Sequence, residues 1–489
     1  MTTSRSSTSA APARARGRWA AVAAALAWMA GAGWFVAQHD VVQFDIDEGF
    51  NLMKALLTQR GQRLYVEVWS DQPPLLTWLL GAVVGPDGGD VAAVRQAMLA
   101  FAGCLVFALY DALRVLRGHA AALAGVLLLA CAASVVRLSG SVMVGLPAIA
   151  FAMLALRAQL AWTQGAPRGW LALAGALLGL SLCTKLFTGL VIVPAVLACV
   201  LVARRKPGGG RGAPALWFGA LLGTVALVLG WALAPATLSQ LYAAHLGADV
   251  VGRQPSHHWF MLLRADWQLH ALAAMGTIAA ARRRERFVVL PTLWWLSAVV
   301  MLLVHRPLWY HHAPLATVPA CLLGGLAIAE LARGGLREAR WLRAAVLIVC
   351  VALSVSVARG RKAPRMPQPE LVSGQRALLE ALRPYAARAR VVVADSPLYP
   401  FVLGLPVPAE LAVPSNKRVV TGQLPLATIV AAIQRERPEV ILLTDHWPTE
   451  VDDAVASGIA ADYRLVHQQQ EPDGRIYVRA DLVAADPAR

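Results

Sequence analysis

Two neighbouring acids, Asp47 and Glu48, have the clearest chemical potential in this sequence of 489 residues. They lie shortly after an apolar run, 19–38, and open the segment Asp-Glu-Gly-Phe-Asn. A carboxylate in such a place can take a proton from a hydroxyl group, and apolar surroundings or a second acid raise its pKa toward the range that suits a general base. The alternative is a helix cap, because acids at the start of a helix over 49–59 offset its macrodipole. The spacing alone leaves both interpretations open.

A lysine inside an apolar segment is the second candidate. The run 169–203 contains a single charged residue, Lys185. This run is too long for one membrane-spanning helix, so we expect two short spans that turn near Lys185. An ionisable residue at such a position is a functional-site candidate, since its ammonium group can bind a phosphate. A lysine that only extends to the membrane interface is the alternative.

The composition indicates that a membrane positions these residues. Hydrophobic residues make up 57% of the chain and charged residues 15%, with a mean hydropathy of +0.54, whereas soluble proteins carry about 25% charge. We expect about eleven spans, counting the long run twice. They lie near 19–38, 92–113, 119–138, 141–160, 169–203, 214–236, 266–281, 287–304, 313–332 and 342–358. The predicted fold class is a polytopic α-helical membrane protein with a polar C-terminal domain.

The net charge of +16 reports on orientation. The N-terminal tail, 1–18, and every second loop after it hold twenty basic and four acidic residues, which accounts for the whole excess. Cytoplasmic loops are enriched in Lys and Arg, so these segments are expected in the cytoplasm. The first outer loop, 39–90, and the C-terminal part, 361–489, then lie outside. A positive charge explained in this way gives no support to nucleic-acid binding.

The chain thus divides into the tail 1–18, a membrane domain 19–360 and a C-terminal domain 361–489. The last of these reads as α/β. Short apolar runs at 391–394 and 440–443 suit buried strands, and the alternation at 475–479 predicts an exposed or edge strand. Helical spacing of apolar residues covers 375–388 and 425–437. At about 125 residues this part can form its own core.

The motifs of the membrane domain resemble those of a known superfamily. They are the pair Asp47-Glu48, then Gly61 through Tyr65, then Gln72-Pro73-Pro74, the stretch from Gly175 to Thr184-Lys185, and the late loop His305 through His312. Together they resemble the polyprenyl-phosphate-dependent glycosyltransferases of the GT-C superfamily. Within it they are similar to the bacterial relatives of protein O-mannosyltransferases and of the lipid A aminoarabinose transferase. The resemblance covers the membrane part, about three quarters of the chain.

The resemblance implies a bacterial inner-membrane enzyme that moves a sugar from a polyprenyl-phosphate donor to a hydroxyl group of a glycan, lipid or protein, on the extracytoplasmic side and with inversion. Asp47 acts as the base, and Glu48 or Asp45 supplies any second acid. Candidate phosphate ligands are Lys185, Arg95 and Arg306. Candidate substrate-binding residues are Tyr65, Gln72, Tyr310, His311 and His312. This chemistry requires neither a metal nor another cofactor.

One stretch departs from the pattern. Many relatives carry an acid at the outer start of the fourth span, where this chain has Met143-Val144-Gly145-Leu146-Pro147. A transporter or flippase of lipid-linked glycans is the alternative function. Such proteins often contain internal repeats and charged or broken helices at the membrane midplane. No internal repeat is evident, and Lys185 is expected near an outer turn.

Overall fold

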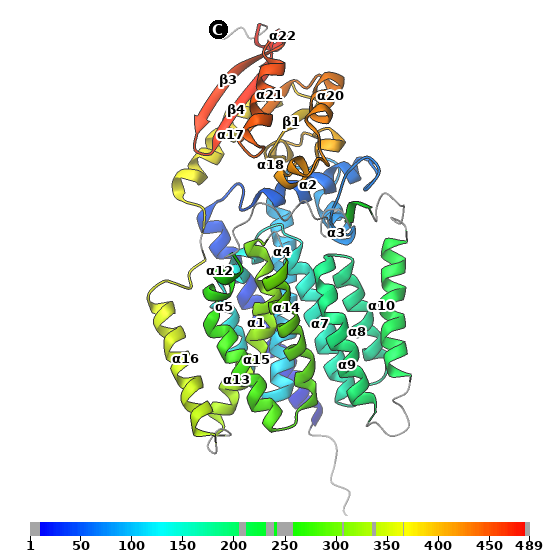
Figure 1. Ribbon diagram of the computed structural model, residues 1–489, viewed down its shortest axis with the longest axis vertical. Coiled ribbons are helices and arrows are strands. Elements are labelled where there is room, and N and C mark those ends of the chain that lie inside the picture. Colours follow the sequence, from blue (N-terminus) through cyan, green and yellow to red (C-terminus); the bar gives the residue numbers. More distant parts are fainter. Residues whose placement is uncertain are drawn as a thin grey trace, which may run out of the picture.

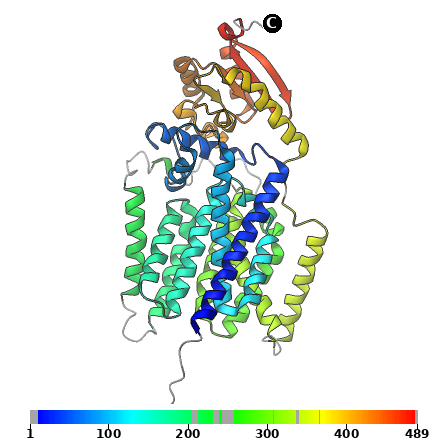
Figure 2. The same ribbon diagram turned by 180° about the vertical axis from the view of Figure 1, so that it is seen from behind.

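The computed structural model describes residues 10–204, 212–230, 239–241, 258–305, 308–334, 339–364 and 366–484. It consists of a helical bundle and a smaller α/β domain that sits on one end of the bundle (Figure 1). The first helix, α1 (Ala10–His39), begins at the far end and finishes on the side of the α/β domain (Figure 2). The start of α1 and the C-terminal domain therefore lie at opposite ends of the molecule, an arrangement compatible with the predicted topology.

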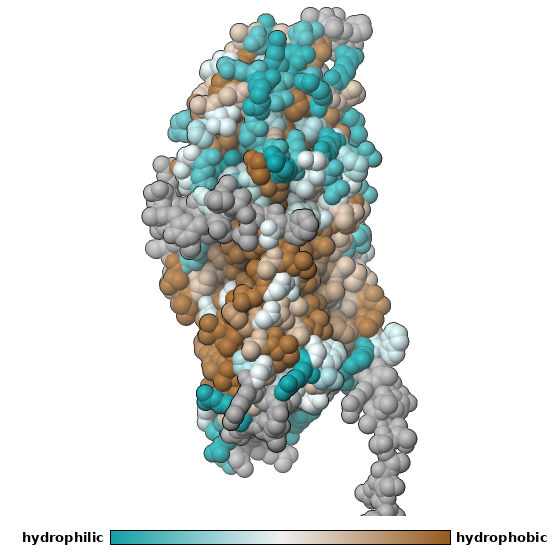
Figure 3. All heavy atoms as spheres, turned by 90° about the vertical axis from the view of Figure 1, so that its right-hand side faces the viewer, coloured by the Kyte–Doolittle hydropathy of each residue, from teal (hydrophilic) through white to brown (hydrophobic). Residues whose placement is uncertain are grey.

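Seven helices in the described part of the chain are long and apolar enough to cross a membrane. They are α1, α4 (Val91–Arg117), α7 (Gly145–Thr163), η2 with α9 (Leu186–Val191 and Ile192–Ala203), η4 with α14 (Arg286–Val288 and Val289–Val304), α15 (Pro314–Ala332) and α16 (Arg340–Ala358). Three further predicted spans are shorter helices: α8 (Gly169–Leu182), α10 (Ala213–Leu229) and α13 (Trp267–Arg282). Apolar side chains cover the bundle, whereas polar ones cover the α/β domain (Figure 3). The chain is a polytopic helical membrane protein, and the total of eleven spans stays a prediction.

One predicted span, 119–138, is not a single straight helix. It consists of α5 (His119–Ala130) and α6 (Ala133–Ser139), which are bent by 82°. The break falls at Ala132, whose backbone is extended, with φ −89° and ψ 90°. No proline or glycine marks this break, so the apolar pattern reads straight through it. Counted as one broken span, the pair is an eighth candidate.

Small residues allow the helices of the bundle to pack closely. A Cβ atom at Gly276 of α13 would lie 1.9 Å from the carbonyl oxygen of Leu323 on α15. A Cβ atom at Gly175 of α8 would lie 2.1 Å from the carbonyl oxygen of Trp217 on α10. Between membrane helices, where the hydrophobic effect is weak, such close backbone approach is a main source of attraction. The two glycines thus permit close packing of α13 on α15 and of α8 on α10.

The first outer loop forms two helices, α2 (Ile46–Gln59) and α3 (Leu75–Val84). Helix α2 lies between the bundle and the α/β domain (Figure 1), and every residue from Glu48 to Leu57 is buried. The short helix α18 (Leu398–Val402) of the C-terminal domain packs directly on it. A Cβ atom at Gly49 would lie 2.6 Å from the backbone nitrogen of Leu398. The outer loop and the C-terminal domain therefore share one apolar core, which includes Phe50, Leu398 and Phe401.

The C-terminal domain has a four-stranded sheet in the order β1-β2-β4-β3. Strands β1 (Val392–Ala394) and β2 (Val440–Leu443) are parallel and wholly buried, as the apolar runs predict. The prediction of an edge strand at 475–479 is wrong, because β4 (Asp473–Arg479) pairs with both β2 and β3 (Tyr463–Gln470). The alternation there reflects one buried and one covered face of an inner strand.

Helices and short turns complete the architecture. The domain contains α17 (Pro369–Ala386), η6 (Ala409–Leu411), α19 (Asn416–Val420), α20 (Leu426–Glu436), α21 (Thr449–Ile459) and α22 (Ala480–Ala484). Helix α17 and helix α20 match the two predicted helices. The late outer segments of the bundle contribute α12 (His258–Ala265) and η5 (Tyr310–His312).

Candidate functional site

The start of α2 separates the roles of its three acids. Asp45 is the N-cap: its backbone is extended and its side chain accepts a hydrogen bond of 3.1 Å from the backbone N–H of Asp47. The cap that we considered for the acid pair is thus provided by Asp45. Asp47 lies in the first turn, and its carboxylate has no hydrogen-bond partner among the described residues. The side chain of Asp47 is available for chemistry.

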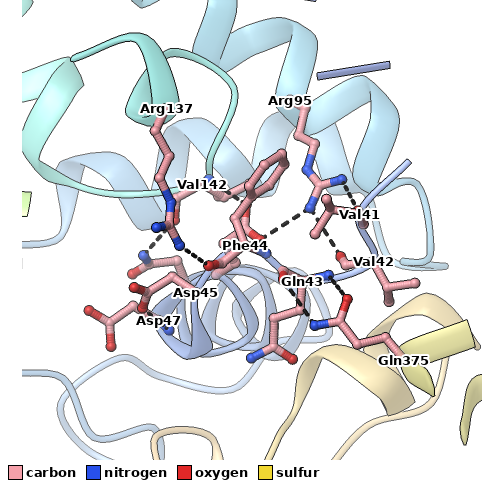
Figure 4. A network of polar contacts seen from close by, with 12 residues as sticks. Val41, Val42, Gln43, Phe44, Asp45, Asp47, Arg95, Arg137, Val142 and Gln375 are labelled. Carbon is pink, nitrogen blue, oxygen red and sulfur yellow. Dashed lines mark hydrogen bonds and ion pairs between the residues drawn. The ribbon is translucent and has the colours of Figure 1, made fainter. Parts of the chain in front are cut away.

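Glu48 lies next to Asp47 but is fully buried and fully bonded. Its carboxylate accepts hydrogen bonds from the backbone N–H groups of Phe44 (2.7 Å) and Val142 (2.9 Å). Arg95 donates to the same carboxylate at 3.1 Å and to the carbonyl oxygens of Val41 and Val42 (Figure 4). The predicted second acid therefore ties the segment before α2 to the bundle and does not line the cavity described next.

The geometry also corrects the prediction that Arg95 binds phosphate. Its guanidinium is engaged by Glu48 and two backbone carbonyls, stacks on the ring of Phe44 at 4.7 Å, and lies outside the cavity. Arg137 has a similar place: it donates to the carbonyl oxygen of Phe44 at 2.8 Å and stacks on Tyr310 at 4.6 Å. Figure 4 shows the two arginines on either side of the segment, with Asp47 projecting away from Arg95. Both arginines position Asp47 indirectly.

A cavity of about 340 Å³ opens beside Asp47. Several parts of the membrane domain line it: the start of α2, the segment before α3, the segment before α7, the turn between α8 and η2, and the loop before α15. The C-terminal domain also contributes to the lining. The cavity is lined by Asp45, Ile46, Asp47, Phe50, Asn51, Lys54, Asp71, Gln72, Met143, Val144, Gly145, Lys185, Phe187, His305, Trp309, Tyr310, His311, His312, Val413, Ser415, Asn416, Lys417 and His446. Segments far apart in the sequence thus converge on one site.

Burial raises the pKa of Asp47 from 3.8 to about 7, and the carboxylates of Asp45 and Asp71 add to the effect. Two cations, Lys185 and Lys54, partly oppose it. The first cause is desolvation, which disfavours the charged carboxylate, and the second is repulsion between like charges. A carboxyl group with a pKa near 7 has the balance of basicity and availability that general-base catalysis requires.

Lysines supply the positive charge of the cavity. Lys185 is buried in the turn between α8 and η2, and its Nζ lies over the ring of Phe187 at 5.5 Å. A Cβ atom at Gly145 would lie 3.8 Å from this Nζ, so the ammonium group faces the stretch 143–147, which departs from the family pattern in lacking an acid. Within the described residues, no carboxylate lies within ion-pair distance of Lys185. Its charge is held in place by packing and is available to a ligand.

Two charged cavity residues of the first outer loop were not predicted. Lys54, two turns after Asp47 on α2, is buried and donates to the hydroxyl of Ser70 at 3.3 Å. Asp71 lies nearby and raises the pKa of Lys54, which burial otherwise lowers. The signal for Asp71 was its place directly before Gln72-Pro73-Pro74. Nothing distinguished Lys54 from an ordinary helix residue until α2 was seen to be buried on both sides.

The predicted substrate-binding residues divide into two groups. Gln72, Tyr310, His311 and His312 line the cavity. Tyr65 does not: it is buried beside the cavity, with φ +68°, and its hydroxyl donates to the carbonyl oxygen of Gln72 at 2.7 Å. Tyr65 therefore shapes the Gln-Pro-Pro segment. Arg306 lies outside the described residues, and its predicted role stays a prediction.

The C-terminal domain contributes Lys417 and His446, which sequence patterns did not select. Burial lowers the pKa of Lys417, although Asp71 and Asp47 oppose the shift. Within the described chain, no three His, Cys, Asp or Glu side chains lie close enough together to hold a metal ion. The chemistry of the described cavity is therefore that of carboxylates, ammonium groups and imidazoles.

Comparisons with known proteins agree with this architecture. The sequence model of the dolichyl-phosphate-mannose-protein mannosyltransferase family matches residues 71–232, which include Asp71 and Lys185 but not Asp47. No curated protein matches the chain in sequence. Among solved structures, ArnT from Cupriavidus metallidurans bound to undecaprenyl phosphate is 16% identical, covering 92% of this chain and 97% of that chain with a TM-score of 0.61.

Two further structures share the fold. The apo state of the same ArnT is 14% identical, covering 95% of this chain and 100% of that chain with a TM-score of 0.58. The Archaeoglobus fulgidus oligosaccharyltransferase, tethered with an acceptor peptide, is 12% identical, covering 90% of this chain and 72% of that chain with a TM-score of 0.53. The chain thus has the GT-C fold. Part of the chain, residues 71–232, matches the mannosyltransferase family model, and the fold as a whole is similar to those of ArnT and of the archaeal oligosaccharyltransferase.

Proposed function

We propose that this chain transfers a sugar from a polyprenyl-phosphate donor to a hydroxyl group of an acceptor, with inversion at the anomeric carbon. The reaction takes place at the cavity beside Asp47, on the extracytoplasmic side of a bacterial inner membrane. The acceptor oxygen forms a bond to the anomeric carbon, while the bond from that carbon to the phosphate oxygen breaks. The acceptor proton passes to Asp47, and polyprenyl phosphate leaves.

The observation that carries the proposal is the pairing of Asp47 and Lys185 in one cavity. The carboxylate of Asp47 has no hydrogen-bond partner among the described residues, and its pKa of about 7 suits a base at neutral pH. The ammonium group of Lys185 lies in the same cavity, and no carboxylate of the described residues forms an ion pair with it. A base and an anion ligand that face one space are what a displacement with a phosphate leaving group requires.

Electrostatics supports the phosphate role of Lys185. The leaving phosphate gains negative charge as the glycosidic bond breaks, and fixed positive charge stabilises it most in a water-poor site. Lys185 lies at the start of η2 and α9, which together are long and apolar enough to span a membrane. A phosphate bound there sits where a lipid chain can run down the outside of the bundle. The ArnT structure with undecaprenyl phosphate bound is consistent with a donor of this class.

A transporter or flippase is less well supported. A transport site near the membrane midplane needs a polar path between helices, whereas Asp47, Lys54 and Lys417 lie at the end of the bundle that carries the C-terminal domain. The family match is to a transferase as well.

The test uses the full chain in lipid nanodiscs and a panel of undecaprenyl-phosphate-linked sugars, with a cell-envelope extract of the encoding organism as the acceptor source. We expect release of undecaprenyl phosphate from at least one donor, with label from the sugar appearing in the extract. Lys185→Met should weaken binding of undecaprenyl phosphate at least tenfold, while Arg388→Met, an exposed charge of the C-terminal domain, should not. Inactivity with every donor, or unchanged binding in Lys185→Met, would refute the proposal.

A further inference from the structure

The cavity beside Asp47 has two chemically different sides. The bundle side carries Lys185, Phe187 and His305, which lie next to helices that can span a membrane. The opposite side comes from the C-terminal domain and carries Lys417 and His446. A lipid-linked donor must arrive from the bundle side, so the domain side is left for the second substrate. Asp47 lies between the two.

The loop that carries His446 is built from the ends of two parallel strands. Asp395 follows β1, and its buried carboxylate accepts hydrogen bonds from the backbone N–H groups of Thr444 and His446, which follow β2, and from the hydroxyl of Thr444. The residue between them, Asp445, has φ +55° and turns the chain back. These four bonds of 2.8–2.9 Å fix the backbone of His446 to the end of β1 within the C-terminal domain.

The imidazole of His446 lies over the face of α2 that carries Asp47. Its ring centre is 5.9 Å from that of Phe50, which is three residues after Asp47 and therefore on the same helix face. The Nε2 atom of His446 is buried and has no hydrogen-bond partner in the described chain. A buried polar atom without a partner is costly. This cost is removed when a ligand supplies the missing hydrogen bond.

A second cavity leads to the same place. It has a volume of about 370 Å³ and lies in the seam between the C-terminal domain and the segment before α2. Asp45, Ile46 and His446 line both cavities and form the wall between them. The rest of its lining includes Tyr399, Thr444 and Asp445, whose side chains can hydrogen-bond a polar ligand. The seam cavity thus adjoins the site through Asp45, Ile46 and His446, and its lining does not include Lys185.

The sheet topology favours a saccharide over a peptide on this side. Peptides are often recognised by pairing with the edge of a sheet, but here the carboxyl ends of β1 and β2 face the site, through Asp395 and His446. The carboxyl ends of parallel strands typically bind small polar molecules. A peptide Ser or Thr also presents one hydroxyl, whereas a sugar presents several. Asp47 and His446 together offer two polar groups that can contact two hydroxyls of the same sugar.

We propose that the C-terminal domain supplies the acceptor subsite, in which the Nε2 atom of His446 binds a second hydroxyl of a saccharide acceptor whose reacting hydroxyl faces Asp47. The acceptor reaches this position through the seam cavity. The inference rests on the proposed function, because it assigns the second substrate of the same transfer reaction. His446 is a substrate-binding residue here and takes no part in the proton transfer.

Two substitutions separate hydrogen bonding from packing. His446→Phe keeps an aromatic ring against Phe50 but removes both ring nitrogens, whereas His446→Gln loses the ring and keeps hydrogen-bonding groups. We expect His446→Phe to raise the acceptor concentration for half-maximal transfer about tenfold, the loss of roughly one hydrogen bond. The half-saturating donor concentration should change less than twofold, and His446→Gln should restore most of the loss. His467→Phe, on β3 and outside both cavities, is the matched control.

The assay is the transfer reaction to envelope extract with a labelled donor that the wild type accepts, followed by protease digestion of the product. Label in a protease-resistant saccharide fraction supports the acceptor class, and label released with peptides overturns it. If His446→Phe behaves like wild type, or if His446→Gln is the worse variant, the binding role of His446 is refuted. Neither result affects the proposed function, which is tested separately by transfer in the wild type and by the Lys185→Met and Asp47→Asn variants.

Discussion

The substitution Asp71→Asn should move the pH dependence of the reaction to lower pH. The pKa of Asp47 is raised from 3.8 to about 7, a change of about three units, or about 4 kcal/mol. Burial is the largest cause, Asp45 the second and Asp71 the third. Two like charges across a small cavity repel by roughly 1–2 kcal/mol at an effective dielectric constant of about 20. Removing the charge of Asp71 should therefore lower the pKa of Asp47 by about one unit.

The lysines oppose part of this shift. Asp71 also stabilises the charged forms of Lys54, Lys185 and Lys417. Without it, the lysines lose their protons more easily, but they remain mostly charged near pH 7 as long as their pKa values stay above the pKa of Asp47, so the direct loss of repulsion decides the direction. Since Asp47 must be deprotonated to accept a proton, kcat/KM of the wild type should rise with pH through about 7. In Asp71→Asn the midpoint of this rise should lie near pH 6, whatever happens to the maximal rate.

The assay is kcat/KM against pH, because this ratio reports the pKa values of the free enzyme. Asp453→Asn removes an exposed carboxylate of α21 outside the cavity and serves as the control. A midpoint that stays near 7 in Asp71→Asn, or moves upward, would show that the rise of kcat/KM with pH does not report the ionisation of Asp47 beside Asp71. An equal shift in Asp453→Asn would show that overall charge, and not the cavity, sets the midpoint.

Three further predictions concern stability and packing. Because the native state binds the Asp47 proton more tightly than the unfolded state, stability is lost as pH rises from about 4 to 7. Asp47→Asn should therefore raise the free energy of unfolding by about 2 kcal/mol more at pH 8 than at pH 5, after allowance for the partial exposure of Asp47 to the cavity, and raise Tm accordingly; an equal gain in Tm at both pH values, measured by thermal unfolding in detergent, contradicts this. Gly49→Ala places a Cβ atom 2.6 Å from the backbone nitrogen of Leu398, so it should destabilise the docked C-terminal domain by about 1–3 kcal/mol and increase proteolysis of residues 361–489, whereas Gly458→Ala, whose added Cβ atom meets nothing within 4 Å, should not. Gly276→Val should lower Tm, since Leu323 leaves no room for a side chain, and an unchanged Tm would exclude the close approach of α13 and α15.

The acid pair shows what spacing can and cannot decide. The sequence singled out Asp47 and Glu48 together, yet consecutive helical residues project about 100° apart, so only one of them can face a given cavity. Which one does so depends on Arg95 and the backbone of Val142, both distant in the sequence. The motif lies at the cavity, but the division of roles between the two carboxylates required the tertiary contacts.

The lysines show the same limit. Lys185 was recognisable because a charge in an apolar run is unusual. Lys54 lies on an amphipathic helix where a lysine is ordinary, and it became notable only because α2 is covered by the C-terminal domain. Lys417 and His446 depend on how that domain docks, which no local pattern encodes. The fold class and most helices could be predicted from hydropathy, whereas the 82° bend between α5 and α6 and the inner position of β4 could not.

The central claim is that Asp47 is the base of a glycosyl transfer. The most direct measurement compares wild type with Asp47→Asn in nanodiscs at pH 8, using a donor that the wild type accepts, with undecaprenyl phosphate binding as the check on folding. The account predicts unchanged binding of undecaprenyl phosphate and a fall in kcat of about a hundredfold to ten-thousandfold. A well-folded Asp47→Asn protein that transfers sugar at the wild-type rate would contradict it.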